Sequence, residues 1–138
     1  MTTAEVFVRV ASADDGTVIE SHRASSRLEA ANYRGTVGAA PDPLETIDLV
    51  GGMGTSVFGS LRMGRVDEGR WHIDHVFVEP DAREVGIGDA LLLHALELLR
   101  RHDATWIGAT ALPGDRSMKN LFERHGLVAQ SISVGKSL

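Results

Sequence analysis

The segment Val76 to Leu91 reads VFVEPDAREVGIGDAL and joins a strand-like apolar run to a glycine-containing loop and the start of a helix. Pro80 ends the strand, because proline has no N–H to donate to a ladder. From Asp89 to His102 apolar residues recur every three or four positions, which predicts a long amphipathic helix. A glycine loop that leads into a helix exposes unpaired N–H groups at the positive end of the helix dipole. The segment therefore predicts an anion-binding site, to which Arg83 would add a charged side chain.

Three strands are expected before this segment. Runs rich in β-branched and apolar residues cover residues 46–50, 56–66 and 71–78. A glycine-rich turn at 51–54 separates the first two, and the Asp-Glu-Gly turn at 67–69 separates the last two. Short strands joined by tight turns predict an antiparallel meander.

The beginning of the chain is open to two interpretations. Residues 5–11 form a β-branched and aromatic run that favours a strand. The sequence that follows allows a helix over 14–33, capped by acidic and serine side chains, or a hairpin turn at Asp15-Gly16. We favour the helix. The prolines and glycines of residues 35–43 then predict a loop.

After the long helix the sequence predicts a strand over 105–112, a short helix that opens at 113–115 and ends at Gly126, and a last strand over 127–134. Strands come first, and strands then alternate with helices. This order predicts one α/β (α+β) domain over residues 1–138, with a mixed, mostly antiparallel sheet flanked by helices.

Length and composition exclude several classes of protein. The chain has 138 residues, of which 43% are hydrophobic, enough for one domain with its own core. It has no cysteine, so disulfides, thiolate nucleophiles and cysteine-type metal sites are excluded. No metal-ligand spacing such as H-E-x-x-H occurs, and no metal is expected. The net charge of −5 argues against a nucleic acid partner.

We expect a cytoplasmic protein that does not associate with membranes. Residues 1–5 lack the basic and apolar regions of a signal peptide. No apolar run approaches the roughly 20 residues that a membrane-spanning helix needs.

A family resemblance rests on the segment from Val78 to Gly88. It resembles the acyl-coenzyme-A-binding motif of the GNAT family of N-acetyltransferases, V-x-P-x-x-[RQ]-x-x-G-x-[GA] followed by a helix. The matching residues are Val78, Pro80, Arg83, Gly86 and Gly88. Residues 122–127 are similar to the family's Y-E-K-x-G-F segment, and residues 30–35 resemble its A-x-Y-R-G ending of the first helix. The resemblance is strong over 71–134 and thin before it.

The resemblance implies a GNAT-like sheet and acetyl-CoA as co-substrate, bound between the strand that ends at Val78 and the strand over 105–112. The pyrophosphate would lie on the backbone amides of 83–90. The implied cofactor-binding residues are Val76, Phe77, Val78, Arg83, Glu84, Val85, Gly86, Ile87, Gly88, Asp89, Ala90, Asp115 and Phe122.

The implied chemistry is direct attack of an acceptor amine on the thioester, with a backbone N–H that polarises the carbonyl and a base that takes the amine's proton. Family members often place a glutamate two residues before the apolar position that is Val76 here, and Asp74 occupies that place. Asp74 is the first candidate for the base, acting directly or through a water. His72 and His75 are the next candidates, because a neutral imidazole suits the task. On a regular strand His72 and Asp74 would share one face, and His75 the other with Ile73.

The chain also departs from the family pattern. Phe122 replaces the tyrosine proposed as general acid, so a thiolate, with a reference pKa of about 8.5, would leave unassisted. Glu84 and Asp89 place carboxylates beside the phosphate loop, where they would weaken affinity unless both point outward. Residues 35–54 are too few for a second helix, so the acceptor pocket would be open or completed by a second subunit in a homodimer.

The leading hypothesis is an acyltransferase that moves an acetyl or short acyl group from coenzyme A to an amine of a small molecule or peptide. A non-catalytic module that binds acyl-CoA, with a regulatory role, is the alternative. A structural or partner-binding domain that lost the ligand is a third hypothesis.

Overall fold

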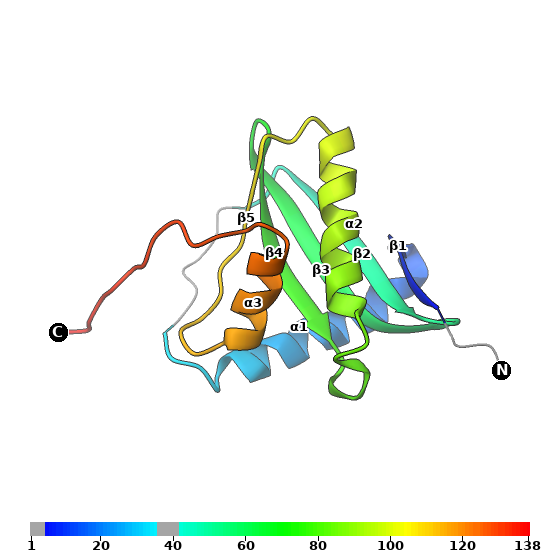
Figure 1. Ribbon diagram of the computed structural model, residues 1–138, viewed down its shortest axis with the longest axis horizontal. Coiled ribbons are helices and arrows are strands. Elements are labelled where there is room, and N and C mark those ends of the chain that lie inside the picture. The colour runs from blue at the N-terminus through cyan, green and yellow to red at the C-terminus, as the bar shows by residue number, and fades with distance from the viewer. Residues whose placement is uncertain (1–4, 36–41) are drawn as a thin grey trace.

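A mixed β-sheet forms the centre of the molecule, with helices on both of its faces (Figure 1). The computed structural model describes residues 5–35 and 42–138. In this part of the chain the strands are β1 (Val6–Val10), β2 (Glu45–Met53), β3 (Ser56–Asp67), β4 (Arg70–Val78) and β5 (Trp106–Gly108). The helices are α1 (Gly16–Ala30), α2 (Ile87–Arg101) and α3 (Arg116–Arg124), with 3-10 turns η1 (Ala13–Asp15) and η2 (Pro80–Ala82).

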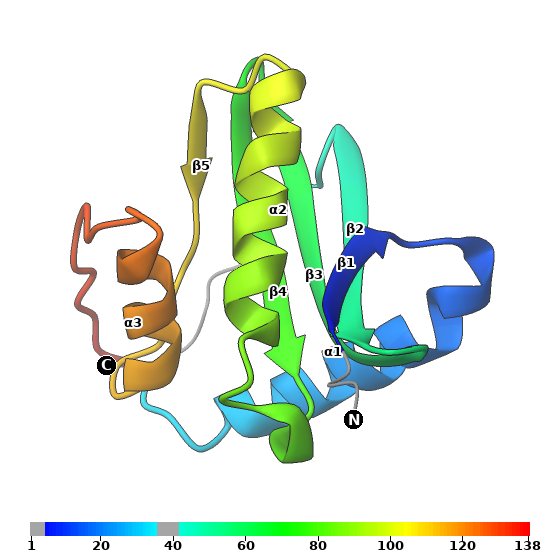
Figure 2. The same cartoon turned by 45° about the vertical axis from the view of Figure 1, so that its right-hand side comes forward.

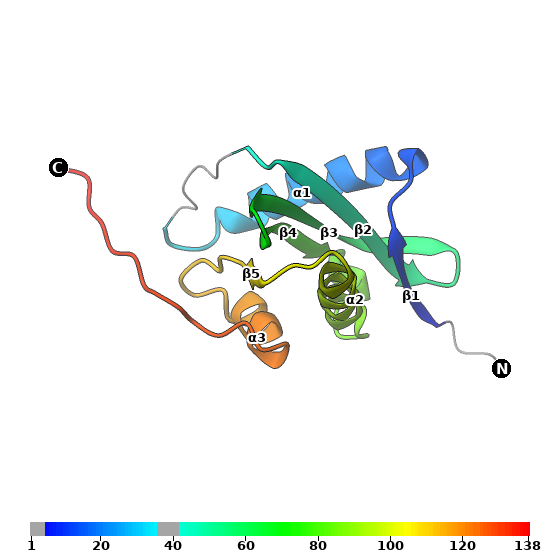
Figure 3. The same cartoon turned by 90° about the horizontal axis from the view of Figure 1, so that it is seen from above.

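The strands lie in the order β1-β2-β3-β4-β5, and all neighbours are antiparallel except the parallel pair β4 and β5. Figure 3 shows α1 on one face of the sheet and α2 with α3 on the other. The expected mixed, mostly antiparallel sheet flanked by helices is therefore confirmed. The helix after β1 is also confirmed, and the alternative hairpin turn at Asp15-Gly16 is wrong.

The core lies mainly between the sheet and α2. Leu91, Leu92 and Ala95 of α2 are fully buried, as are Leu49 of β2 and Leu61 of β3. The α1 side has fewer apolar residues, and its buried helix residues are Ile19 and His22. Burial of a polar residue on this face explains why the apolar periodicity of α1 is weaker than that of α2.

Two predicted strands differ from the structure. The strand expected over 105–112 is confined to β5, and the chain after Gly108 leaves the sheet. The strand expected over 127–134 does not form. Leu127 packs partly against the core, and the chain then runs away from the body of the protein (Figure 1) with Val128, Ile132 and Val134 exposed. Alternating apolar residues favour a strand only where a neighbouring strand offers an edge. Most of the expected loop over 35–43 lies outside the described residues.

A β-bulge interrupts β4 at Asp74. Arg62 of β3 lies opposite His75, and the next residue, Met63, lies opposite Ile73, so Asp74 is the extra residue without a partner. A bulge shifts the alternation of side chains by one position.

The bulge reverses the predicted facing of His75. Directly opposite residues share a face, and Leu61, two residues before Met63, lies opposite Val76. Ile73 and Val76 therefore both face α2, although they are three residues apart. His75 lies on the α1 face, and the expectation that it shares a face with Ile73 is wrong.

Asp15 connects the end of β1 to the start of α1. Its carboxylate accepts hydrogen bonds from the Arg9 guanidinium (2.7 and 3.1 Å) and from the Ser12 backbone N–H (2.7 Å). These partners favour the ionised form and lower the pKa of Asp15 from its usual 3.8 to about 2. A depressed carboxyl pKa stabilises the folded protein above the unfolded pKa, and this contribution is lost as the pH falls toward 2.

We predict that Asp15→Asn lowers the free energy of unfolding at neutral pH by about 1–2 kcal/mol. The difference from the wild type should shrink as the pH falls below about 4, because protonation removes the same interaction from the wild type. Urea unfolding of both proteins at about pH 7 and about pH 3 measures this difference. Asp14→Asn, an exposed neighbour, is the control, and an equal loss in both variants would contradict the role of Asp15.

Candidate functional site

The sheet opens between β4 and β5. The two strands pair only from Arg70–Trp106 to His72–Gly108, and beyond this point the chain turns toward α3 while β4 continues (Figure 2). A cavity of about 140 Å³ lies in this region, bounded by the second half of α1, the bulge of β4, residues 110–112 and α3. The candidate residues Asp74, His75, Val76, Asp115 and Phe122 line it.

The free edge of β4 presents backbone groups to this opening. The Glu79 N–H donates to the Phe58 carbonyl of β3 (2.8 Å), so the odd-numbered residues at this end of β4 bond to β3. By the same alternation, the N–H groups of Val76 and Val78 point away from β3. In agreement, the Val78 carbonyl accepts a hydrogen bond from Arg83 (2.7 Å) instead of from a strand.

The loop after β4 turns sharply into α2. Glu84 and Gly86 have φ values of 69° and 93°, in the left-handed region. α2 begins at Ile87, two residues earlier than predicted, and Gly86 is its N-cap. The N–H groups of the first helical turn have no acceptor within the helix. A Cβ built on Gly86 meets no atom within 4 Å, so the loop is open above these amides.

Arg83 is held by α1 and β4. Its Nη2 donates to Glu29 (2.6 Å), and its guanidinium lies 5.4 Å from the centre of the Phe77 ring. With the hydrogen bond to Val78, these contacts fix the loop to α1. In this structure the Arg83 guanidinium therefore contacts Val78, Glu29 and Phe77.

Asp89 is neutralised by α3. Arg124 donates to both carboxylate oxygens (3.1 and 3.2 Å), and His125 Nε2 lies 2.8 Å from Oδ1. The Arg124 hydrogen bonds, with a further contribution from His125, lower the pKa of Asp89. One of the two acidic residues beside the predicted phosphate loop therefore has a cationic partner, Arg124, whereas the other, Glu84, is exposed.

The three candidate bases have different surroundings. Asp74 is half-exposed, with Arg23 of α1 at 3.7 Å. His75 is buried on the α1 face, and burial lowers its pKa to about 4. Burial also lowers the pKa of His72, against an opposing effect of Asp74, and His72 is not among the described residues that line the cavity. The structure thus brings Asp74 and His75 to the cavity.

Two polar residues of this region were missed by the sequence analysis. His22 of α1 and Ser60 of β3 are buried, and Ser60 Oγ lies 2.9 Å from both His22 Nδ1 and His75 Nε2. Their sequence positions carry no motif. The available signal was a histidine on the buried stripe of α1, three residues after Ile19, which is more often structural than functional.

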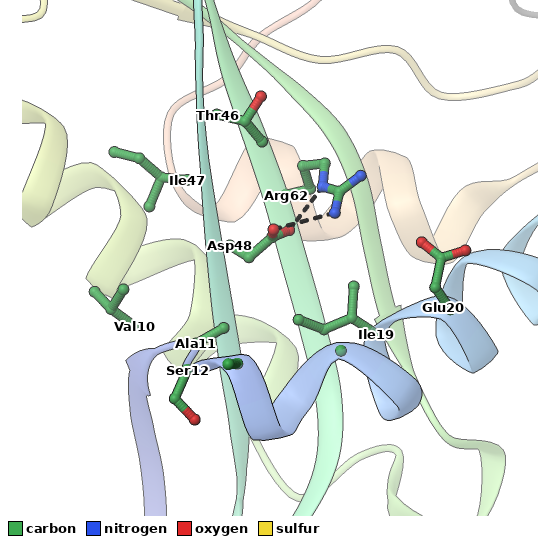
Figure 4. Close-up of a pocket in the computed structure, with 11 residues that line it drawn as sticks. Val10, Ala11, Ser12, Ile19, Glu20, Thr46, Ile47, Asp48 and Arg62 are labelled. Carbon is green, nitrogen blue, oxygen red and sulfur yellow. Dashed lines mark hydrogen bonds and ion pairs between the residues drawn. The ribbon is translucent and has the colours of Figure 1, made fainter.

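A larger hollow, of about 450 Å³, lies at the other end of α1 (Figure 4). Arg62 and Asp48 form a two-pronged ion pair in its wall (2.7 and 3.1 Å), and Glu20 of α1 also lines it. Its lining comes from η1, α1, β2, β3 and the end of β1, and includes neither the free edge of β4 nor the loop at 83–88. The hollow is therefore separate from the candidate site.

Over the described residues, no group of three histidine and acidic side chains could hold a metal ion. None of the described helices is both long and apolar enough to cross a membrane.

The sequence of residues 13–127 matches the family model described as the GNAT acetyltransferase family. The match covers most of the chain, and the protein therefore belongs to this family of N-acetyltransferases. No curated protein has a sequence that matches this chain.

Solved structures show the same fold. The transcriptional regulator from Bacillus halodurans C-125 is 18% identical with a TM-score of 0.73, and the match covers 97% of this chain and 100% of that chain. The ribosomal-protein-alanine N-acetyltransferase from Brucella melitensis biovar Abortus 2308 is 16% identical with a TM-score of 0.71, and the match covers 97% of this chain and 100% of that chain. The PaiA N-acetyltransferase from Thermoplasma acidophilum, solved with coenzyme A, is 13% identical with a TM-score of 0.71, and the match covers 88% of this chain and 89% of that chain.

We predict that Gly86→Asp weakens acetyl-CoA binding by at least about tenfold, because it adds a carboxylate and a strained left-handed residue to the open loop. Isothermal calorimetry with acetyl-CoA measures the change. Gly54→Asp is the matched control, since Gly54 also has a positive φ and open space around its Cβ position but lies in the β2–β3 turn. Equal affinities for Gly86→Asp and wild type would show that the anion site lies elsewhere.

Proposed function

We propose that the protein transfers an acetyl group from acetyl-CoA to an amine held in the cavity between β4 and residues 110–112. One observation carries this proposal: the free edge of β4 ends directly at the loop that exposes the first-turn amides of α2. A single extended molecule with amide groups and a pyrophosphate can use both features.

The residues of the site fit coenzyme A. Val76 and Val78 offer amides to the pantetheine arm, and the first turn of α2 offers a positive end to the pyrophosphate. The open space at Gly86 allows close approach, and Arg124 removes the effective charge of Asp89. Phe122 closes the cavity with an apolar surface.

Acetyl-CoA supplies the thioester whose carbonyl carbon is attacked. The Val76 N–H is the donor placed to polarise that carbonyl, because it points into the opening. Asp74 takes a proton from the amine, directly or through a water, since its half-exposed carboxylate lines the cavity. Phe122 has no proton to give, so the thiolate leaves without general acid catalysis from this position.

The acceptor is an amine that carries positive charge. Glu29, Asp74 and Asp115 line the cavity, and no lysine or arginine is among the described lining residues. Arg83 pairs with Glu29 and Arg23 lies 3.7 Å from Asp74, so these two arginines offset part of the negative charge that would attract a cation. Among the structurally similar proteins are aminoglycoside acetyltransferases, one solved with sisomicin, and a ribosomal-protein-alanine N-acetyltransferase. Aminoglycosides, polyamines and peptide N-termini are therefore the first acceptors to test.

The test is thiol release from acetyl-CoA with a panel of these amines. We expect turnover with at least one cationic amine, and a kcat lowered by at least about tenfold in Asp74→Asn with acetyl-CoA affinity within about twofold of wild type. Asp103→Asn, an exposed carboxylate outside the site, should keep wild-type turnover. Tight binding of acetyl-CoA without transfer to any amine would favour the non-catalytic module instead.

A homodimer is a separate proposal. The C-terminal segment alternates apolar and small polar residues, and Val128, Ile132 and Val134 are exposed. An extended apolar segment of this kind can pair with the sheet edge of a second copy. We expect sedimentation to give a dimer mass that becomes a monomer mass when residues 128–138 are removed; a monomeric full-length chain would contradict the proposal.

A further inference from the structure

A line of polar side chains crosses the protein between α1 and the sheet. His75 Nε2 lies 2.9 Å from Ser60 Oγ, and Ser60 Oγ lies 2.9 Å from His22 Nδ1. His22 Nε2 lies 3.5 Å from a carboxylate oxygen of Glu79. The exposed fractions of His75, Ser60 and His22 are 8%, 1% and 2%, whereas the side chain of Glu79 is 46% exposed. The line therefore begins in the interior, beside the cavity, and ends in solvent.

We infer that His75 accepts a proton from the reacting amine and that Ser60, His22 and Glu79 carry the proton from His75 to solvent. The inference rests on the proposed acetyl transfer. His75 lines the same cavity as Asp74, because the β-bulge places these two successive residues beside it.

The two hydrogen bonds of the line allow more than one direction, because a histidine nitrogen donates or accepts according to its tautomer. His22 Nε2 lies 3.5 Å from the Glu79 carboxylate without a hydrogen bond to it, and the proposal uses the direction in which this nitrogen carries the hydrogen. His22 Nδ1 then accepts the hydroxyl hydrogen of Ser60. Ser60 Oγ in turn accepts from the Nε2–H of His75, which leaves His75 Nδ1 as an unprotonated nitrogen. His75 Nδ1 and His22 Nε2, the nitrogens at the two ends of the buried line, are both buried and have no hydrogen-bond partner among the described residues.

The reaction releases two protons. An amine with an ordinary pKa arrives as an ammonium ion, and R–NH3⁺ plus acetyl–S–CoA gives R–NH–acetyl, CoA–S⁻ and two H⁺. Asp74 is exposed and takes the first proton, which frees the nitrogen lone pair. The second proton becomes acidic as the C–N bond forms and the C–S bond breaks. His75 takes this proton at Nδ1.

The relay allows a buried histidine to act without holding a positive charge. Burial strongly disfavours the imidazolium form of His75 and so lowers its pKa. The charges of Arg23 and Arg62 also lower this pKa, whereas those of Asp74 and Asp48 raise it. As Nδ1 of His75 gains a proton, its Nε2 gives one to Ser60. Ser60 gives its hydroxyl proton to His22 Nδ1, and His22 Nε2 gives one to the Glu79 carboxylate. Each buried group stays neutral, and only the exposed carboxylate changes its charge.

The first test is ¹⁵N NMR of the histidine side chains in the full-length protein without ligand. We expect His22 and His75 both to carry hydrogen on Nε2 and to have an unprotonated Nδ1 at neutral pH. Hydrogen on Nδ1 of His75 would overturn the proposal, because that nitrogen could not then accept a proton. This measurement needs no acceptor and no turnover.

The second test is Ser60→Ala, assayed with an amine that wild-type protein acetylates. We expect kcat to fall by at least about tenfold, with acetyl-CoA affinity and the KM of the amine within about twofold of wild type. The dependence of kcat on the fraction of D2O should be curved in wild type, where several protons move together, and linear in the variant. Ser56→Ala, at the exposed start of β3, is the matched control. Unfolding temperatures of all three proteins identify any general loss of fold.

The outcomes separate the relay from the proposed function. Wild-type turnover in Ser60→Ala, with an unchanged D2O dependence, would overturn the relay and leave acetyl transfer intact. Failure of the wild-type protein to acetylate any amine would overturn the proposed function and the catalytic use of the relay together, and the NMR tautomers would still report the direction of the hydrogen bonds.

Discussion

The short pairing of β4 with β5 is the constraint on which the site depends. The two parallel strands bond over three residue pairs, from Arg70 to His72 and from Trp106 to Gly108, and then separate. Unpaired backbone amides in a folded protein are normally satisfied by another strand, by water or by a ligand. The separation leaves the amides of Val76 and Val78 free and places them next to the loop that begins α2. The separation therefore leaves an unpaired strand edge that ends at the open first turn of α2, the two features that we propose acetyl-CoA uses.

The bulge at Asp74 is a single extra residue in β4 that sets which way the neighbouring side chains face. One extra residue in β4 keeps Ile73 and Val76 on the core side with α2, and it turns His75 toward α1. His75 then meets Ser60, which lies diagonally across from it on the same face, because Ser60 is opposite Phe77 in the register. The same extra residue leaves Asp74 exposed beside the cavity. The bulge thus separates two neighbouring residues into an exposed carboxylate and a buried imidazole.

The local elements were predictable, and the contacts between distant residues were not. Periodicity predicted α2 within two residues, and turn residues predicted the meander of β2, β3 and β4, because these patterns act over short distances. The strand over 127–134 was predicted wrongly, since its pattern contains no information about whether an edge is available. The Asp89–Arg124 pair spans 35 positions and His22–Ser60 spans 38, so neither pair has a local sequence signature. The motif from Val78 to Gly88 predicted a place for the candidate site, which stays a prediction, and only the structure brought the candidates Asp74 and His75 to one cavity.

The central claim is that acetyl-CoA lies along the free edge of β4. Amide hydrogen exchange of Val76 and Val78, followed by NMR with and without acetyl-CoA, tests it most directly. The account predicts that exchange at both amides slows by at least about tenfold on binding, because each gains a hydrogen-bond acceptor, while amides of β2 change little. Saturating acetyl-CoA that leaves Val76 and Val78 unchanged, with protection elsewhere in the protein, would contradict the account.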